Sequence, residues 1–438
     1  MQNICAEHKS SINIIHTSTI ITATAQLWQE AQQHPRFTHF QRQAHCQVVT
    51  FLRSVLCLHP LLQDVDPRAV SNICWSLAKV GVHPDALVPG MMDSLTANFV
   101  NRVEAQNAKH RPNAQDMSNF TWGCAVFKHT PSDAAMSSVS GCFMSIMEAQ
   151  DVQDRPNAHD MSTFIWGCAI LDHKPSDAAL SSTFRCFVKL MEAQDVRDRP
   201  RLQGVSNLVW AYAIFKHAPS DADVSSVLRY FVCGVLGKKP DFQTVSDLMF
   251  ACAVLGVDVK QEIADVLALV LLDHDKDRPY TRHYCNTAWS LAVLGVLHYE
   301  VFEALLSQLP PPKSLTPRAK HLDNTDEVIN IGLAQLCQAL YFVQPTPSAP
   351  AEQHKAWGAF EKALSTFGPR PTPDPTYGFP GNQKLCFALT ELGLHFEAKV
   401  PVLGNWADAV LQPTSNCTPA VMIVVATAND CLANIGNR

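Results

Sequence analysis

Short polar residues recur at one position of a repeated segment, and their type and spacing suit contacts with nucleic-acid bases. An aromatic residue, called here the anchor, recurs about every forty residues, and the polar residue lies three positions before it. Repeat proteins that read single strands place such side chains at fixed helical positions, about one base per repeat. The alternative role is a helix cap or a hydrogen-bond ladder between repeats. The candidate base contacts are Asn72, Asn119, Thr163, Asn207, Asp247 and Asn286.

Cations recur at a second position, directly before a proline that precedes each repeated segment. One cation per repeat along one edge can follow a phosphate backbone. Acidic neighbours such as Asp154 and Asp198 leave a solvated turn as the alternative. Two further lysines follow the segment and extend the candidate set. The candidate phosphate contacts are Arg111, Arg155, Arg199, Lys239, Arg278, Lys128 and Lys216.

The anchors themselves permit two interpretations, a core position or a base-stacking platform. Around each anchor, apolar residues recur at positions −5, −2, +2, +4 and +5, which is the spacing of a wide apolar stripe on an α-helix. This favours a structural role, with stacking as the alternative. The anchors are Trp75, Trp122, Trp166, Trp210, Phe250 and Trp289.

Each repeat is predicted to be a pair of antiparallel helices. A proline ten residues before the anchor and a cap candidate such as Asp116 or Asp160 start the first helix. Position +1 is always small and position +3 is always alanine, so another helix can approach closely. Pro-Ser-Asp, as at 131–133, starts the second helix. Stacked helix pairs predict an all-α, right-handed superhelix with a short, fragmentary α/β tail.

The repeats divide the chain into four parts. Residues 1–65 are expected to hold a degenerate helical repeat and part of an organelle transit peptide, because the N-terminus is rich in Ser and Thr and poor in acids. Residues 66–310 form the six-repeat array. Proline-rich linkers with one or two helices follow at 311–381. Residues 382–438 are predicted to form a helix and an α/β fragment, with VMIVVA (421–426) as a strand.

Composition argues against several function classes. The 15 cysteines include no CxxC pair, so we expect neither a zinc site nor a disulfide framework. No apolar run is long enough for a membrane span. No P-loop, GxSxG, HExxH or kinase signature occurs, so no enzyme, cofactor, metal or small-molecule substrate is expected. The net charge of −6 is unusual for a nucleic-acid binder and favours a protein-binding scaffold as the alternative.

RPNAQDMSNFTWGCAVF (111–127) and its sister segments resemble the octotricopeptide repeat of green-algal organelle proteins. This resemblance implies sequence-selective binding of single-stranded RNA in a chloroplast or a mitochondrion, with the chloroplast preferred. It further implies a role in transcript processing, stability or translation, with other proteins of a ribonucleoprotein complex as partners.

The C-terminal segment from Leu389 is similar to the opening of a RAP domain, which also occurs in FAST-kinase-like RNA regulators. Asp408-Ala-Val-Leu matches the first acidic strand of that family, but the following strand lacks the Glu-x-Asp that the family carries. A metal-dependent nuclease needs clustered carboxylates. We therefore expect a truncated, inactive domain, and a RAP-type nuclease is the least favoured alternative.

Overall fold

The computed structural model describes eleven stretches of the chain and four single positions. The stretches are 13–32, 41–57, 65–105, 111–148, 155–195, 198–237, 240–257, 281–294, 396–402, 405–411 and 421–423, and the single positions are 259, 296, 301 and 305. Lys239, Arg278 and the predicted linkers at 311–381 lie outside the described residues.

The six anchor segments are helices, which we call the A helices. They are α4 (Pro67–Val80), α7 (Ala114–Phe127), α9 (Ala158–Ile170), α11 (Leu202–Ile214), α13 (Phe242–Leu255) and α15 (Thr281–Val293). A second helix, the B helix, follows each of the first four. The B helices are α6 (Met91–Glu104), which the short α5 (Pro84–Leu87) precedes, α8 (Asp133–Met147), α10 (Asp177–Met191) and α12 (Asp221–Gly237).

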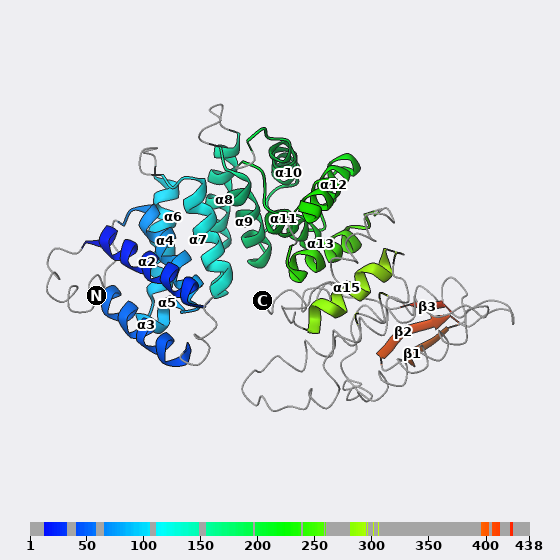
Figure 1. Ribbon diagram of the computed structural model, residues 1–438, viewed down its shortest axis with the longest axis horizontal. Coiled ribbons are helices and arrows are strands. Elements are labelled where there is room, and N and C mark those ends of the chain that lie inside the picture. The colour runs from blue at the N-terminus through cyan, green and yellow to red at the C-terminus, as the bar shows by residue number, and fades with distance from the viewer. Residues whose placement is uncertain are drawn as a thin grey trace. The chain divides into compact units, whose positions relative to one another are not determined.

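The chain forms two compact units, Met1–Val227 and Leu228–Arg438, whose boundary lies within α12. In the first unit the A helices pack side by side in chain order, α4 on α7, α7 on α9 and α9 on α11 (Figure 1). In the second unit α13 packs on α15. The predicted all-α helical-repeat solenoid is confirmed.

One more helix pair precedes the six repeats. Helix α2 (Ile14–Gln32) packs on α4 in the way that α4 packs on α7, and α3 (Gln41–Leu56) packs on α2. Ser18 and Ala25 of α2 match the serine at −4 and the alanine at +3, but Thr22 takes the place of the aromatic anchor. Ser76 of α4 donates a hydrogen bond to this hydroxyl at 3.1 Å, so α2 occupies the place of an A helix.

The A helices begin eight positions before the anchor, and the cap residue lies at position −9. Asn113 and Asn157 cap α7 and α9 by accepting the backbone N–H of Asp116 and Asp160, respectively. The prediction that the two aspartates are the caps is therefore wrong. They sit at the third helical position, and Asp116 accepts the N–H of Asn113 in return, which completes a capping box.

Small residues at position +1 let consecutive A helices approach closely. A Cβ atom added to Gly123 would lie 2.8 Å from Cys74 Cβ, and one added to Gly167 would lie 2.8 Å from Thr121 Cγ2. Both neighbours belong to the preceding A helix. The glycines are therefore required by packing, since a side chain at these positions would push the helices apart.

The A helices end in a left-handed residue at position +6. Gly81 and Gly256 occupy this position in two repeats, but Lys128, Asp172 and Lys216 adopt it as well, with φ of 53°, 55° and 52°. The next backbone N–H bonds back to the carbonyl five residues earlier, as His129 does to Cys124. This is the hydrogen bond of a Schellman motif, which satisfies the last carbonyls of the helix.

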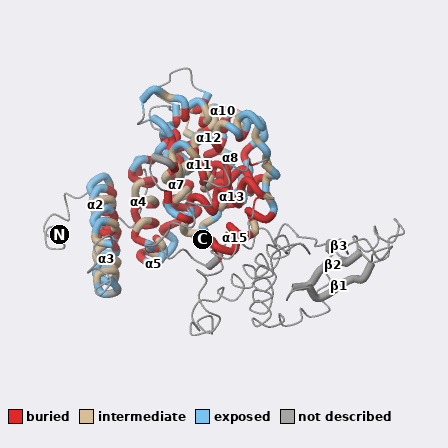
Figure 2. The backbone as a smooth tube through the Cα atoms, turned by 45° about the vertical axis from the view of Figure 1, so that its right-hand side comes forward, coloured by how far each residue is buried: buried red, intermediate tan, exposed pale blue. Residues whose placement is uncertain are grey.

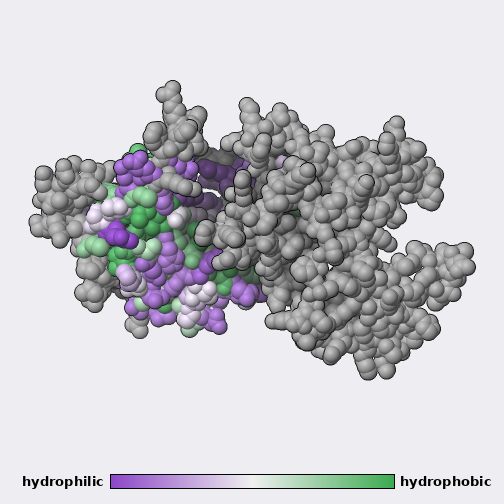
Figure 3. All heavy atoms as spheres, turned by 90° about the horizontal axis from the view of Figure 1, so that it is seen from below, coloured by the Kyte–Doolittle hydropathy of each residue, from purple (hydrophilic) through white to green (hydrophobic). Residues whose placement is uncertain are grey.

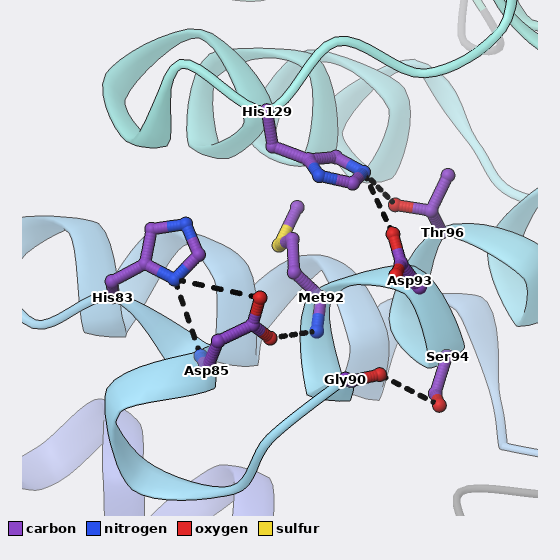
Figure 4. Close-up of polar contacts among 8 residues, drawn as sticks. All are labelled: His83, Asp85, Gly90, Met92, Asp93, Ser94, Thr96 and His129. Carbon is purple, nitrogen blue, oxygen red and sulfur yellow. Dashed lines mark hydrogen bonds and ion pairs between the residues drawn. The ribbon is translucent and has the colours of Figure 1, made fainter.

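Histidines at position +7 connect α7 and α11 to the preceding B helices. His129 Nε2 lies 3.1 Å from Thr96 Oγ1 and 4.0 Å from Asp93 Oδ1, both on α6 (Figure 4). His217 Nδ1 lies 3.2 Å from Asp177 Oδ1 on α10. These two imidazoles therefore make contacts between neighbouring repeats.

The core of the first unit lies between the A and B helices. Phe99 stacks on Phe120 and Phe143 on Phe164, with ring centroids about 4 Å apart, so α6 and α8 each pack a phenylalanine against the next A helix. Figure 2 shows exposed positions along the outer side of B helices such as α10. The repeats thus share one continuous apolar interior.

The described residues of the C-terminal segment are strands. They are β1 (Phe396–Val402), β2 (Asn405–Leu411) and β3 (Val421–Ile423), which form an antiparallel sheet in the order β1-β2-β3. Asp408 lies in β2, and β3 covers the first half of the strand predicted at 421–426.

Candidate nucleic-acid interface

Four positions of each A helix share one face. Positions −7, −3, 0 and +4 relative to the anchor are separated by four, three and four residues, so they follow one side of an α-helix. On α4, α7, α9 and α11 we call this surface the A face. It consists of Arg68, Asn72, Trp75 and Lys79; Gln115, Asn119, Trp122 and Val126; His159, Thr163, Trp166 and Ile170; and Gln203, Asn207, Trp210 and Ile214.

Every A-face position except that of Trp210 is exposed or half-buried. All four −7 residues are exposed, and all four residues at −3 and all four at +4 are half-buried. Because α4, α7, α9 and α11 pack consecutively, equivalent residues form rows across the helices. Each row presents one side chain per repeat.

The charge of the A face differs from that of the chain. The chain has 40 acidic and 34 basic residues, yet none of the sixteen A-face positions holds a carboxylate. Arg68 and Lys79 are basic, and His159 is titratable. Hydrophilic and hydrophobic residues are interspersed on the described surface in Figure 3. The acidic balance of the sequence therefore says nothing against a polyanion on this particular surface.

The structure places the predicted base-contact residues in one row of each unit. Asn72, Asn119, Thr163 and Asn207 are half-buried on the A face, and none of them caps a helix. In the second unit, Asn286 is half-buried, and its Oδ1 lacks a hydrogen-bond partner among the described residues.

Asp247 is the exception in this row. It is buried, and its Oδ2 accepts a hydrogen bond from Gln243 Nε2 at 3.3 Å on the same helix. The carboxylate is therefore less accessible than the amides of the first unit, and a base-contact role for it has the least structural support.

The anchors do not share one environment. Trp210 and Phe250 are buried, with 3% and 7% of their surface exposed. Trp75, Trp122, Trp166 and Trp289 are only half-buried. These four tryptophans are therefore partly buried in the array and partly exposed, so they combine a structural role with the exposure that stacking needs.

Lys79 fills the space between two of these rings. Its ammonium lies 5.5 Å from the centroid of Trp75 on its own helix and 4.9 Å from that of Trp122 on the next. Both distances fall within cation–π range. Partial burial lowers the pKa of Lys79, and Lys79 forms no ion pair with any residue that the structure describes.

His159 interacts electrostatically with Lys79. Its Nδ1 is 3.5 Å from Thr163 Oγ1, which links positions −7 and −3 of α9. Partial burial lowers the pKa of His159; Asp160 opposes this shift, and the positive charges of Arg201 and Lys79 add to it. Arg201 stands at the cap position of α11 but makes no capping hydrogen bond.

The predicted phosphate contacts lie at the two ends of the A helices. Arg111 and Arg199 donate their Nε–H groups to the carbonyls of Ala105 and Ala193, at 2.9 and 2.8 Å, so both help to close the loop before an A helix. Arg155 is exposed before α9. Lys128 and Lys216 are exposed at the opposite ends of α7 and α11. The structure therefore does not gather these cations on the A face.

The outer row of the A face, at position −7, was not among the site residues predicted from the sequence. Position −7 reads Arg68, Gln115, His159, Gln203, Gln243 and Arg282. No member is apolar or acidic, and this regularity is visible when the six repeats are compared with one another. Lys79 had no such signal, because the other repeats hold an aliphatic residue at +4.

No group of three metal-ligating side chains occurs in the part of the chain that the structure describes. None of its described helices is long and apolar enough to cross a membrane. No protein-family model matches the sequence, and no curated protein is significantly similar to it.

Proposed function

We propose that this protein binds single-stranded RNA along the A face and selects its sequence. The observation that carries the proposal is the alignment of polar, aromatic and basic side chains in rows across α4, α7, α9 and α11, without a carboxylate among them. Single-strand readers use this combination of hydrogen-bonding side chains, aromatic faces and cations.

Each repeat would read one nucleotide through two polar positions. The residue at −3 reaches the base edge, and the residue at −7 lies one turn away on the same face, as Asn119 and Gln115 do on α7. Amide side chains offer both donors and acceptors, so they can pair with the Watson–Crick edge of an exposed base. Half-exposed indoles such as Trp122 supply stacking surface.

The proposed setting is an organelle, with the chloroplast preferred over the mitochondrion, and the proposed role is in transcript processing, stability or translation. The resemblance of the repeats to the octotricopeptide family supports this setting. No catalysis is proposed, and the protein would act with other members of a ribonucleoprotein complex.

Selection from a random RNA pool tests the proposal. Full-length protein should enrich single-stranded sequences with a shared motif and should prefer them to duplex RNA of the same sequence. Replacing Asn119 and Asn207 by Ala should remove preference at two positions of the motif. Enrichment without a shared motif, or equal binding of duplex RNA, would contradict sequence-selective single-strand binding.

A protein-binding scaffold is the second candidate, and one observation in the second unit favours it. Val254 and Val293, at position +4 of α13 and α15, are 39% and 41% exposed, and this unit carries Asp247 in the −3 row. Exposed aliphatic residues suit a protein ligand better than a polyanion. Val254→Ser with Val293→Ser should abolish capture of such a partner and leave RNA affinity unchanged.

A further inference from the structure

One side chain of the A face is not explained by packing or by base reading. Lys79 is a half-buried cation between two indoles, and no described carboxylate neutralises it. The equivalent residues of the next repeats, Val126 and Ile170, fill the same position with aliphatic atoms. An aliphatic residue would therefore satisfy the packing here, and the charge of Lys79 contacts the faces of the two indoles but no carboxylate in the described part of the fold.

Two further basic groups, His159 and Arg201, belong to the electrostatic surroundings of this lysine. His159 and Arg201 interact electrostatically with each other, and His159 also interacts with Lys79. Asp160 is the acid that faces this group, and it is buried and accepts a hydrogen bond from Ser118 at 3.3 Å. Partial burial lowers the pKa of His159, so this imidazole is neutral at neutral pH, and Lys79 and Arg201 carry the positive charge that attracts an anionic ligand.

We propose that Lys79, held between Trp75 and Trp122, binds the phosphate backbone of the single strand on the A face. This assignment rests on the proposed function and specifies it, because it places the phosphates on the open side of the A helices and not at the loop cations Arg111, Arg155 and Arg199. The two indoles hold the ammonium in place and limit its rotamers, so less conformational entropy is lost when it meets a phosphate.

The test is Lys79→Met in the full-length chain. Methionine keeps an unbranched stem between Trp75 and Trp122 and removes the charge. With a fluorescein-labelled random 20-nucleotide RNA, the slope of log affinity against log salt should decrease by about 0.7, the value of one phosphate contact on a single strand. Affinity at 0.1 M salt should fall about fivefold, which follows from that slope, and it should fall equally for all sequences.

Two matched variants complete the experiment. Lys128→Met removes the same charge from the end of α7, away from the A face, and should leave the salt slope unchanged. Lys79→Arg retains a cation and should restore most of the slope. An unchanged slope in Lys79→Met overturns the assignment, as does a loss confined to some sequences, which would make Lys79 a base contact. Thermal unfolding of each variant confirms that the fold is intact.

The failure of this inference can be separated from the failure of the proposed function. If wild-type protein binds RNA and Lys79→Met has the same salt slope, only the phosphate assignment fails. If wild-type protein binds no RNA, tripolyphosphate is titrated while tryptophan fluorescence is recorded. If tripolyphosphate quenches the fluorescence of the wild-type protein but not that of Lys79→Met, an anion site without RNA binding is supported. If the wild-type protein shows no quenching, the phosphate assignment and the proposed function are both overturned.

Discussion

Ser71 of α4 donates a hydrogen bond to Asp116 of α7 at 3.2 Å, and both side chains are buried between two consecutive repeats. The same contact joins Ser118 of α7 to Asp160 of α9 at 3.3 Å. The serine at −4 of one repeat thus contacts the residue at −6 of the next. Between α9 and α11 the residue at position −6 is Gly204, so Ser162 has no carboxylate to contact there.

Removal of the first of these serines should weaken the interface between two repeats. Ser71→Ala leaves the buried Asp116 carboxylate with one hydrogen bond fewer, which should cost about 1–3 kcal/mol of unfolding free energy. Ser162→Ala is the matched control, because Ser162 is equally buried at the same helix position but bonds only to the carbonyl of His159. Urea unfolding should show a larger loss of unfolding free energy for Ser71→Ala than for Ser162→Ala. Equal losses would contradict a stabilising role of the serine–aspartate hydrogen bond between repeats.

The glycine at position +1 of α9 should not tolerate a methyl group. Gly167→Ala would place a Cβ 2.8 Å from Thr121 Cγ2 and 3.2 Å from the carbonyl carbon of Thr121, so α7 and α9 would have to separate. We expect a loss of about 1–3 kcal/mol. Gly141→Ala on α8 is the control, since no atom lies within 4 Å of its added Cβ, and it should stabilise by up to about 1 kcal/mol through helix propensity.

The inter-repeat histidines should make stability depend on pH. Partial burial lowers the pKa of His129 and His173 below the ordinary value of 6.5. The unfolded chain therefore binds more protons than the folded chain as the pH falls below about 6.5, and stability should decrease there. His129→Val with His173→Val follows the pattern of repeats that hold valine at +7, such as Val82, and should flatten this dependence. Unfolding curves between pH 5 and 8 provide the measurement, and an unchanged profile would show that other groups cause the pH dependence.

Asn119→Asp should change which base is preferred at one position of the RNA. An amide both donates and accepts, whereas a carboxylate only accepts, so the preferred base edge must change. Asn113→Asp on the same helix adds the same charge and keeps a good helix cap, so it controls for the general effect of an extra negative charge. Binding to an RNA set with one varied position measures the preference. A uniform loss over all four bases would assign Asn119 a structural role.

The periodicity of the sequence alone determined that the chain forms stacked helix pairs. Apolar residues at helical spacing, small residues at +1 and Pro-Ser-Asp at the start of the B helices specify elements and their close packing, because these depend on local geometry. Ser132 and Ser176 cap α8 and α10 as that motif predicts. The pattern is weak at α2, where Thr22 replaces the aromatic anchor, so the sequence predicts only a degenerate repeat within residues 1–65 and does not place this helix beside the A helices.

Only the tertiary structure decided which side of each helix meets solvent. Trp122 and Trp210 occupy the same sequence position, yet the first is half-exposed and the second is buried. Burial depends on what neighbouring helices cover, and a single repeat does not encode that. For the same reason, the net charge of −6 did not indicate that the A face lacks carboxylates. Lys79 is a candidate phosphate contact only because the next helix places Trp122 beside it.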